Sequence, residues 1–292
     1  MAIKIKKLSY ALGASVTGVD LKKGLSGAEL DSIRNAWHEH LVLVFPGQEL
    51  TPDQQIAFGK RFGSLDDHKA APFYRHPQYP EIFLITNRRV GGKESETKDT
   101  GRVWHSDHSH TTHPTMASML YCLEIPEVGG NTMFANMYMA FDALSDGMKN
   151  ILGRLEAVHS MDRYSRYNPY MWGRNPAQLA EMTRVAPPVA QPVVRIHPET
   201  GRKALYVSEG YTSHFVGMTE EESRGLLQFL FDHSVRPEFT YRHAWQVNDL
   251  LMWDNRCTMH LAPADYTHAQ PRHMHRVTVL GTPSGRLLET SA

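Results

Sequence analysis

The stretch DLLMWDNRCTMH at residues 249–260 places an apolar run, a polar turn and a histidine in direct succession. A short apolar run closed by polar turn residues is typical of a strand buried in a sheet. His260 follows that turn, where a ligand at the mouth of a β-barrel would stand. We therefore expect a buried strand that delivers His260 to one end of a barrel.

Further short apolar runs recur along the chain and are read as strands. They are LVLVFPG (41–47), MASMLYCLEI (116–125), EVGGNTMFANM (127–137), PVVRIHP (192–198), KALYVS (203–208), FTYRHAW (239–245) and HRVTVLG (275–281). Segments 26–40, 51–63, 139–155 and 219–235 have helical spacing, and Ser26 and Thr51 are candidate N-caps. Strands without sustained βαβ alternation favour a mainly β protein, a barrel or jelly roll with flanking α-helices.

No linker divides the 292 residues, so residues 1–292 are expected to form a single domain. Segment 88–103 is polar and rich in glycine, which is typical of an exposed loop. Segment 160–190 shows little periodicity and is expected to be an irregular insertion. A long insertion of this kind is often a functional lid, although packing on the barrel or a subunit contact is an alternative.

The charge balance argues against polyanionic partners. Lys and Arg together number 31, as do Asp and Glu, and no basic stripe appears. Lys4, Lys6 and Lys7 are read as a solvated edge. Nucleic acid and anionic membranes are therefore not expected as partners.

Cysteine content and the N-terminal sequence bear on location. The two cysteines, Cys122 and Cys257, lie in apolar runs and are read as reduced core thiols. The first residues contain neither a signal peptide nor a membrane span. A cytoplasmic location is the resulting expectation. Whether the chain forms a homo-oligomer, such as a dimer or a tetramer, stays open.

The stretch WHSDHSH at residues 104–110 concentrates candidate metal ligands. In an extended chain His105 and Asp107 share one face, while His108 and His110 share the other. Two histidines and one carboxylate on one side of an ion are typical of non-haem Fe(II) oxygenases. We therefore take His260 as the candidate third ligand.

Two other readings of these histidines compete. A zinc site could use His108, His110 and His113, with or without Asp107. An isolated His-x-Asp pair is also common as a surface hydrogen-bonded pair. From the spacing alone, all three readings stay open.

Arg272 and Arg276 stand four residues apart in an expected strand, so they face the same way. Buried arginines need anions, and a guanidinium binds a carboxylate through two parallel hydrogen bonds. Either they bind organic anions, or they pair with acidic residues of the chain itself. The candidates for such pairing are Asp249, Asp254 and Asp265.

Five segments together resemble the taurine/2,4-dichlorophenoxyacetate family of Fe(II)- and 2-oxoglutarate-dependent dioxygenases. They are WHSD (104–107), VGGNTMF (128–134), HPETGRKALYV (197–207), DLLMWDNRCTMH (249–260) and RHMHR (272–276). The resemblance extends over residues 8–282. It implies a double-stranded β-helix core, a cupin-like jelly roll, with His105, Asp107 and His260 as the iron ligands.

The resemblance also implies Fe(II), 2-oxoglutarate and O₂ as cofactor and co-substrates. Thr132 and Arg272 would hold the distal carboxylate of 2-oxoglutarate. Arg276 would face the acidic head group of the substrate. His68 falls where taurine dioxygenases place a histidine near the sulfonate, and His108 is assigned to the same substrate side. The implied reaction hydroxylates a small organic acid and releases succinate and CO₂.

The sequence departs from the taurine pattern at two positions. Ala71 stands where taurine dioxygenases carry a tyrosine, and Gly101 where they carry an asparagine that contacts the amine. A taurine-like ammonium would lose partners, so a carboxylate or sulfonate with an apolar or aromatic tail is expected. Aryloxyalkanoates and alkyl sulfonates are the candidates. The alternative functions are a zinc-dependent hydrolase using the His105–His113 cluster and a non-catalytic cupin-like binding protein.

Overall fold

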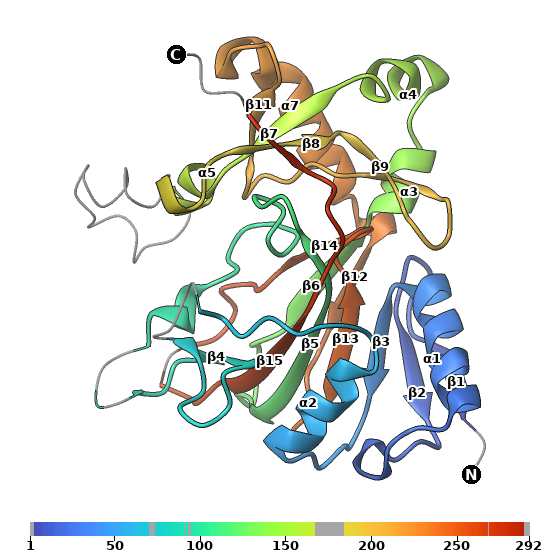
Figure 1. Cartoon of the computed structure of the whole chain (residues 1–292), viewed down its shortest axis with the longest axis vertical. Coiled ribbons are helices and arrows are strands. Elements are labelled where there is room, and N and C mark those ends of the chain that lie inside the picture. The colour runs from blue at the N-terminus through green and yellow to red at the C-terminus, as the bar shows by residue number, and fades with distance from the viewer. Residues whose placement is uncertain are drawn as a thin grey trace.

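The computed structural model of the chain describes residues 3–69, 74–90, 92, 95–166, 184–267 and 269–288. The protein is mainly β, with helices packed outside the strands (Figure 1). Its largest sheet has seven strands in the order β1-β2-β3-β13-β5-β15-β4. These strands are β1 (Lys4–Lys7), β2 (Ala14–Thr17), β3 (Val42–Phe45), β13 (Leu250–Asp254), β5 (Thr115–Glu124), β15 (His273–Leu280) and β4 (Ile82–Thr86).

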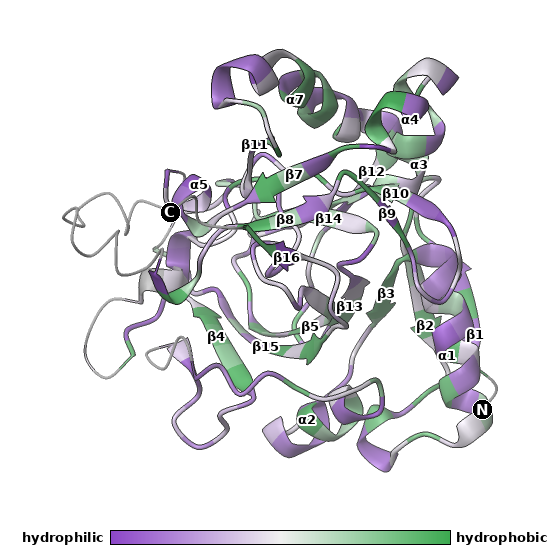
Figure 2. Cartoon of the chain, turned by 45° about the horizontal axis from the view of Figure 1, so that its top comes forward, coloured by the Kyte–Doolittle hydropathy of each residue, from purple (hydrophilic) through white to green (hydrophobic). Residues whose placement is uncertain are grey.

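Three smaller sheets make up the rest of the β structure in the described residues. Their orders are β12-β6-β14, β11-β7-β8-β16 and β10-β9. The strands are β6 (Thr132–Asn136), β7 (Glu156–His159), β8 (Val189–Pro192), β9 (Val194–Ile196), β10 (Lys203–Leu205), β11 (Thr212–Phe215), β12 (Thr240–His243), β14 (Thr258–Leu261) and β16 (Arg286–Leu287). In Figure 2 the large sheet curves along one side of the interior, and β14, β8 and β7 lie along the other. This is the expected jelly-roll core.

Side chains of β13 alternate between two hydrophobic clusters, as the period of a strand requires. Leu250 and Met252 pack toward helices α1 (Gly27–His40) and α2 (Pro52–Lys60) on the outer face of the large sheet. Leu251 and Trp253 pack into the interior, against residues of the smaller sheets. The buried strand expected from the opening stretch is confirmed.

The helix caps read from the sequence are also confirmed. The Ser26 hydroxyl accepts the backbone N–H of Glu29, and Thr51 does the same for Gln54, each in a capping box. Helix α2 ends at Lys60, before the expected Gly63. Helix α7 (Glu220–Ser234) matches the expected segment closely.

The single helix expected over 139–155 is wrong. The structure has α3 (Met137–Asp142) and α4 (Asp146–Leu152), followed at once by strand β7. Ser145 interrupts the segment because its hydroxyl accepts the backbone N–H of Met148 and begins a new helix. Short strands such as β1, β4 and β11 also escaped prediction.

The two expected loop segments are more ordered than predicted in their described parts. Segment 88–103 contains a 3₁₀ turn over Glu96–Asp99. Segment 160–190 begins with helix α5 (Met161–Ser165) and ends in β8, while residues 167–183 lie outside the described residues. Within the described residues no helix is long and apolar enough to cross a membrane. Cys122 and Cys257 are both free and buried.

Candidate metal centre

Two backbone hydrogen bonds join the segments that carry His105 and His260. The N–H of His105 donates to the carbonyl of His260 at 3.1 Å, and the N–H of His260 donates back at 2.8 Å. The pair forms an antiparallel β-bridge, so the two imidazoles lie on the same side with ring centroids 4.1 Å apart. The fold thereby sets two candidate ligands next to one another.

Asp107 enters the same site from a turn. The extended conformation expected for 104–110 holds only to Ser106, because residues 107–110 form a turn. His108 in that turn has a φ of 54°, in the left-handed region. The expectation of two alternating faces is therefore wrong beyond Ser106, yet His105 and Asp107 still converge.

The three side chains form a buried cluster of potential ligands. His105, Asp107 and His260 each offer one ligating atom, and these atoms lie within 4.8 Å of one another. Nε2 of His105 lies 3.7 Å from one carboxylate oxygen of Asp107, and Nε2 of His260 lies 3.9 Å from the other. These distances are too long for hydrogen bonds and suit groups that share a cation.

Ionisation of the cluster also suits a cation. Burial lowers the pKa of His260 to about 3, an effect that nearby His105 reinforces. Burial likewise lowers the pKa of His105. Burial opposes ionisation of Asp107, but the positive charge of the Arg276 guanidinium favours it and the pKa of that carboxyl is lowered. The result is two neutral imidazoles and one carboxylate, the protonation state of a metal-binding set.

The hydrogen bond of His105 selects the nitrogen that faces the site. Nδ1 of His105 lies 2.8 Å from the carbonyl oxygen of Val103, to which it donates. The lone pair of the ring is therefore on Nε2, which points toward Asp107. A backbone carbonyl on the remote nitrogen is a common support for a metal-binding histidine. The donor set fits a divalent first-row metal with open positions.

A small cavity opens beside these histidines. Its walls include the predicted residues His105, Thr132, His260, Arg272 and Arg276. The remaining walls are Ile85, Thr100, Gly101, Leu120, Trp253 and Ala262. Among the described residues no carboxylate lines it, so these walls combine apolar side chains with two guanidinium groups.

Arg272 is 5% exposed and has no carboxylate partner within the described residues. Its Nε donates to the carbonyl of Gly130 at 3.0 Å. Thr132 lies nearby on the same wall, and its hydroxyl oxygen accepts the indole N–H of Trp245 at 3.0 Å. The proton of that hydroxyl remains available to an anion in the cavity.

Arg276 is held differently. Its Nη1 donates to a carboxylate oxygen of Asp107 at 3.2 Å, and its guanidinium lies over the ring of Phe83 at 4.6 Å. The Nε of Arg276 is buried and has no hydrogen-bond partner in the described part of the chain. Arg276 thus connects the candidate metal cluster to the cavity.

The alternative pairing of Arg272 and Arg276 with three aspartates is wrong. Asp249 is hydrogen-bonded to His243, Asp254 pairs with Arg256, and Asp265 pairs with Arg242. Each candidate partner is therefore committed elsewhere.

His68 and His108 are not among the residues that line the cavity. They share Asp66 instead, with the Nδ1 atoms of His68 and His108 at 3.5 Å and 4.0 Å from its Oδ2. His68 is buried, and its ring packs against Phe83. Because Arg276 covers the same ring, these groups lie close to the cavity's cationic wall.

The zinc set His108, His110 and His113 is not assembled. The rings of His108 and His110 are 6.0 Å apart, and His110 stacks on Tyr211. His113 is exposed and hydrogen-bonded to Thr112. These three residues do not form a ligand cluster among the described residues.

A second group of potential ligands, His197, Asp254 and Cys257, is also buried. Nδ1 of His197 accepts backbone N–H groups of Glu199 and Thr200, so Nε2 carries the proton that it donates to Asp254 at 3.0 Å. Arg256 occupies both oxygens of Asp254, at 2.8 Å and 2.7 Å. The group is a satisfied structural network, and neither histidine nitrogen is left for a metal.

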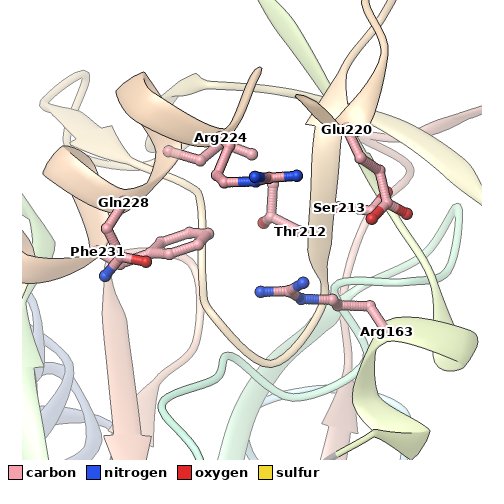
Figure 3. A pocket seen from close by; sticks show the side chains of 8 residues that line it. Arg163, Thr212, Ser213, Glu220, Arg224, Gln228 and Phe231 are labelled. Carbon is pink, nitrogen blue, oxygen red and sulfur yellow. The ribbon is translucent and has the colours of Figure 1, made fainter. Parts of the chain in front are cut away.

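Another hollow lies between α5, β11 and α7, on a different part of the molecule (Figure 3). Arg163 and Arg224 face each other across it, with Glu220 at its rim. Its walls contain none of the residues that the sequence predicted for function. We assign it no role in the chemistry of the metal centre.

Two residues near Asp107 escaped the sequence analysis. Ser118 and Asn255 are both fully buried, and each hydrogen-bonds Asp107. Asn255 lies in the WDNRC turn, within the same segment that the sequence analysis used to select His260. A polar residue just after an apolar run was therefore a signal that could have identified it. Ser118 has no such mark in the sequence.

Comparisons with known proteins agree on one family. The model of the family described as taurine catabolism dioxygenase TauD, TfdA family matches residues 4–278. An alpha-ketoglutarate-dependent 2,4-dichlorophenoxyacetate dioxygenase of Burkholderia sp. (strain RASC) is 35% identical over 291 residues. That match covers 96% of this chain and 95% of the relative.

Another relative and a solved structure extend the comparison. An alkylsulfatase of Acinetobacter baylyi is 32% identical over 289 residues, covering 96% of this chain and 85% of the relative. The crystal structure of AAD-2 in complex with Mn(II) and N-oxalylglycine is 34% identical, with a TM-score of 0.82. It covers 97% of this chain and 99% of that chain.

Proposed function

The chain belongs to the taurine catabolism dioxygenase TauD, TfdA family, and on that premise we propose that it oxidises an organic acid with an apolar body. It is a 2-oxoglutarate-dependent non-haem iron dioxygenase, with Fe(II), 2-oxoglutarate and O₂ as cofactor and co-substrates. When bound, ferrous iron supplies the dioxygen chemistry that couples oxidative decarboxylation of 2-oxoglutarate to oxidation of a substrate C–H bond. The reaction releases succinate and CO₂.

His105, Asp107 and His260 are the proposed iron ligands. The observation that carries this proposal is their convergence as a buried set of two neutral imidazoles and one carboxylate beside an open cavity. Three protein ligands on one side leave positions for the co-substrates. The β-bridge and the Val103 carbonyl orient the two rings before any metal binds.

Thr132 and Arg272 are the proposed binding residues for the distal carboxylate of 2-oxoglutarate. Burial of a guanidinium without a carboxylate partner is unfavourable unless a ligand supplies the anion. Arg272 is in that situation, and the Thr132 hydroxyl on the same wall can donate a further hydrogen bond. Together they would select a dicarboxylate whose other end reaches the metal.

Arg276, with His68 and His108 behind it, is the proposed site for the acidic head of the prime substrate. The Nε of Arg276, which is buried and has no hydrogen-bond partner among the described residues, supports this assignment. Ile85, Leu120 and Ala262 would contact an apolar body. Because no carboxylate lines the cavity among the described residues, an ammonium such as that of taurine would find no partner among them.

The position of oxidation determines the products. If the oxidised carbon bears an ether oxygen, a sulfate ester or a sulfonate, the hydroxylated product breaks down to a carbonyl compound and releases that group. Aryloxyalkanoates and alkyl sulfonates remain the candidate substrate classes. The chain is also proposed to act as one domain over residues 1–292.

A coupled assay tests the proposal. Purified protein would be supplied with Fe(II), 2-oxoglutarate and O₂ plus one acid at a time: a phenoxyacetate, an alkyl sulfate, an alkanesulfonate or taurine. We expect succinate release above the background only with the acids that lack an ammonium. Turnover of taurine alone would contradict the substrate proposal, and no succinate with any acid would favour a binding protein.

A further inference from the structure

Two buried residues on different elements hydrogen-bond Asp107, one at its carboxylate and the other at its backbone N–H. The Ser118 hydroxyl, on β5, donates to Oδ2 of Asp107 at 2.6 Å. Asn255, in the turn between β13 and β14, accepts the backbone N–H of Asp107 on its Oδ1 at 3.1 Å. Both residues are 0% exposed, and neither lines the cavity.

The donors and acceptors in this network can be assigned because each hydrogen bond restricts the next. Nδ2 of Asn255 donates to the Ser118 oxygen at 3.0 Å, so the single hydroxyl proton of Ser118 is directed to the carboxylate. Oδ1 of Asn255 also accepts the indole N–H of Trp253 at 3.1 Å, which fixes the orientation of the amide. The short bond from Ser118 to an ionised carboxylate is of the strong, charge-assisted type.

The turn that carries Asn255 is itself held firmly. Its backbone N–H donates to the carbonyl of Met116 at 2.9 Å. Asp254, the preceding residue, receives Arg256 on both carboxylate oxygens, and its carbonyl accepts the Thr258 hydroxyl at 2.7 Å. Asn255 therefore has little freedom to follow a displacement of Asp107.

We propose that Ser118 and Asn255 are positioning residues that keep the Asp107 carboxylate in the one orientation in which it shares a cation with His105 and His260. This inference rests on the metal site proposed above. Asp107 belongs to a turn, where a carboxylate is free to rotate unless its surroundings stop it. Supports of this kind typically change metal affinity by roughly 10–100-fold when removed.

Metal binding by the purified protein provides the test. Mn(II) would be titrated into metal-free protein without oxygen, and free Mn(II) measured by electron paramagnetic resonance. Ser118→Ala removes the donor to the carboxylate. Asn255→Asp keeps the shape and the acceptor oxygen but replaces the amide donor with a second acceptor, which competes for the Ser118 proton.

Two further variants separate positioning from a general loss of structure. Ser118→Thr keeps the hydroxyl and should restore Mn(II) binding to within about 3-fold of the unaltered protein. Ser234→Ala, on α7, removes another fully buried hydroxyl that donates to the Leu230 carbonyl, far from the cluster in the sequence and on a different element. It should leave Mn(II) affinity unchanged.

We expect Ser118→Ala and Asn255→Asp to weaken Mn(II) binding by about 10–100-fold, while circular dichroism shows folded protein. Binding as tight as in the unaltered protein would overturn the inference, and so would an equal loss in Ser234→Ala. If Ser118→Ala does not fold, the other two variants test the inference. Asn255→Asp should still weaken Mn(II) binding by about 10–100-fold, and Ser118→Thr should bind Mn(II) within about 3-fold of the unaltered protein. Failure of the unaltered protein to bind Mn(II) would overturn the proposed metal site, and this inference with it.

Discussion

His105 and His260 are joined by a reciprocal pair of backbone hydrogen bonds, and their imidazole rings lie 4.1 Å apart. The candidate metal site therefore depends on backbone pairing as well as on side chains. The pairing orients both rings toward Asp107, and this arrangement makes the individual roles of the residues testable.

His260→Ala should weaken Mn(II) binding by on the order of 100-fold or more, because one of three ligands is lost. The measurement is the same titration of metal-free protein, followed by succinate release with Fe(II). His110→Ala is the matched control, since His110 belongs to the rejected zinc set and stacks on Tyr211. Equal losses in the two variants would argue against the proposed ligand set.

Arg272→Ala should weaken 2-oxoglutarate binding by roughly 2–5 kcal/mol, because a buried charge pair with the ligand is lost. Calorimetric titration of the Mn(II)-loaded protein without oxygen measures this. Arg272→Lys keeps the positive charge but cannot form two parallel hydrogen bonds to a carboxylate. Its affinity for 2-oxoglutarate should lie between those of Arg272→Ala and the unaltered protein. Arg236→Ala, which removes an exposed ion pair with Glu238, should leave the affinity for 2-oxoglutarate unchanged. An unaltered affinity in Arg272→Ala would contradict the assignment.

Arg276→Ala should mainly affect the prime substrate. We expect its KM to rise by about 10-fold or more, since one charge-assisted contact is worth at least 1.4 kcal/mol at this position. The Kd of 2-oxoglutarate should stay within about 3-fold. Because Arg276 also contacts Asp107, Mn(II) affinity is measured in parallel. Equal weakening of both ligands would contradict the division of roles between the two arginines.

Gly101→Ala should reduce both stability and activity. Gly101 has a φ of 80°, and a Cβ added there would lie 3.4 Å from Cε1 of His105. A left-handed conformation costs an L-residue about 1–2 kcal/mol, and relief of that strain would shift a segment whose methyl group contacts a proposed ligand. Gly225→Ala, in α7 with open space around its Cβ, is the control and should be neutral or slightly stabilising. Urea unfolding measures the change in stability, and succinate release measures the change in activity.

Asp254→Asn should lower the free energy of unfolding by about 3–5 kcal/mol, because Arg256 loses its buried partner. Burial opposes ionisation of Asp254, but Arg256 and His197 outweigh it and lower the pKa of that carboxyl. A lowered pKa contributes stability above the usual value near 3.9, which is lost as the pH falls below it. Urea unfolding between pH 7 and pH 3 should therefore show a weaker acid dependence in Asp254→Asn. Asp31→Asn, at an exposed position of α1, should behave like the unaltered protein.

The sequence by itself determined much of this protein. Local signals were strong: the continuous apolar run Leu250–Trp253, closed by a polar turn, predicted a buried strand, and Ser26 and Thr51 predicted two helix starts. The motif order predicted the family and the candidate residues of the site. Where one residue interrupts a pattern, as Ser145 does between α3 and α4, periodicity alone joined two elements into one.

Only the tertiary structure decided which groups are partners. The spacing of Arg272 and Arg276 left their anions open; in the fold Asp249, Asp254 and Asp265 pair with other residues, and Arg276 contacts Asp107 instead. It likewise separated His108 and His110 from the cluster and brought Ser118 beneath Asp107. Contacts between distant residues depend on strand pairing and on the path of turns. Side-chain chemistry can be read along the chain, but proximity exists only once the sheets have formed.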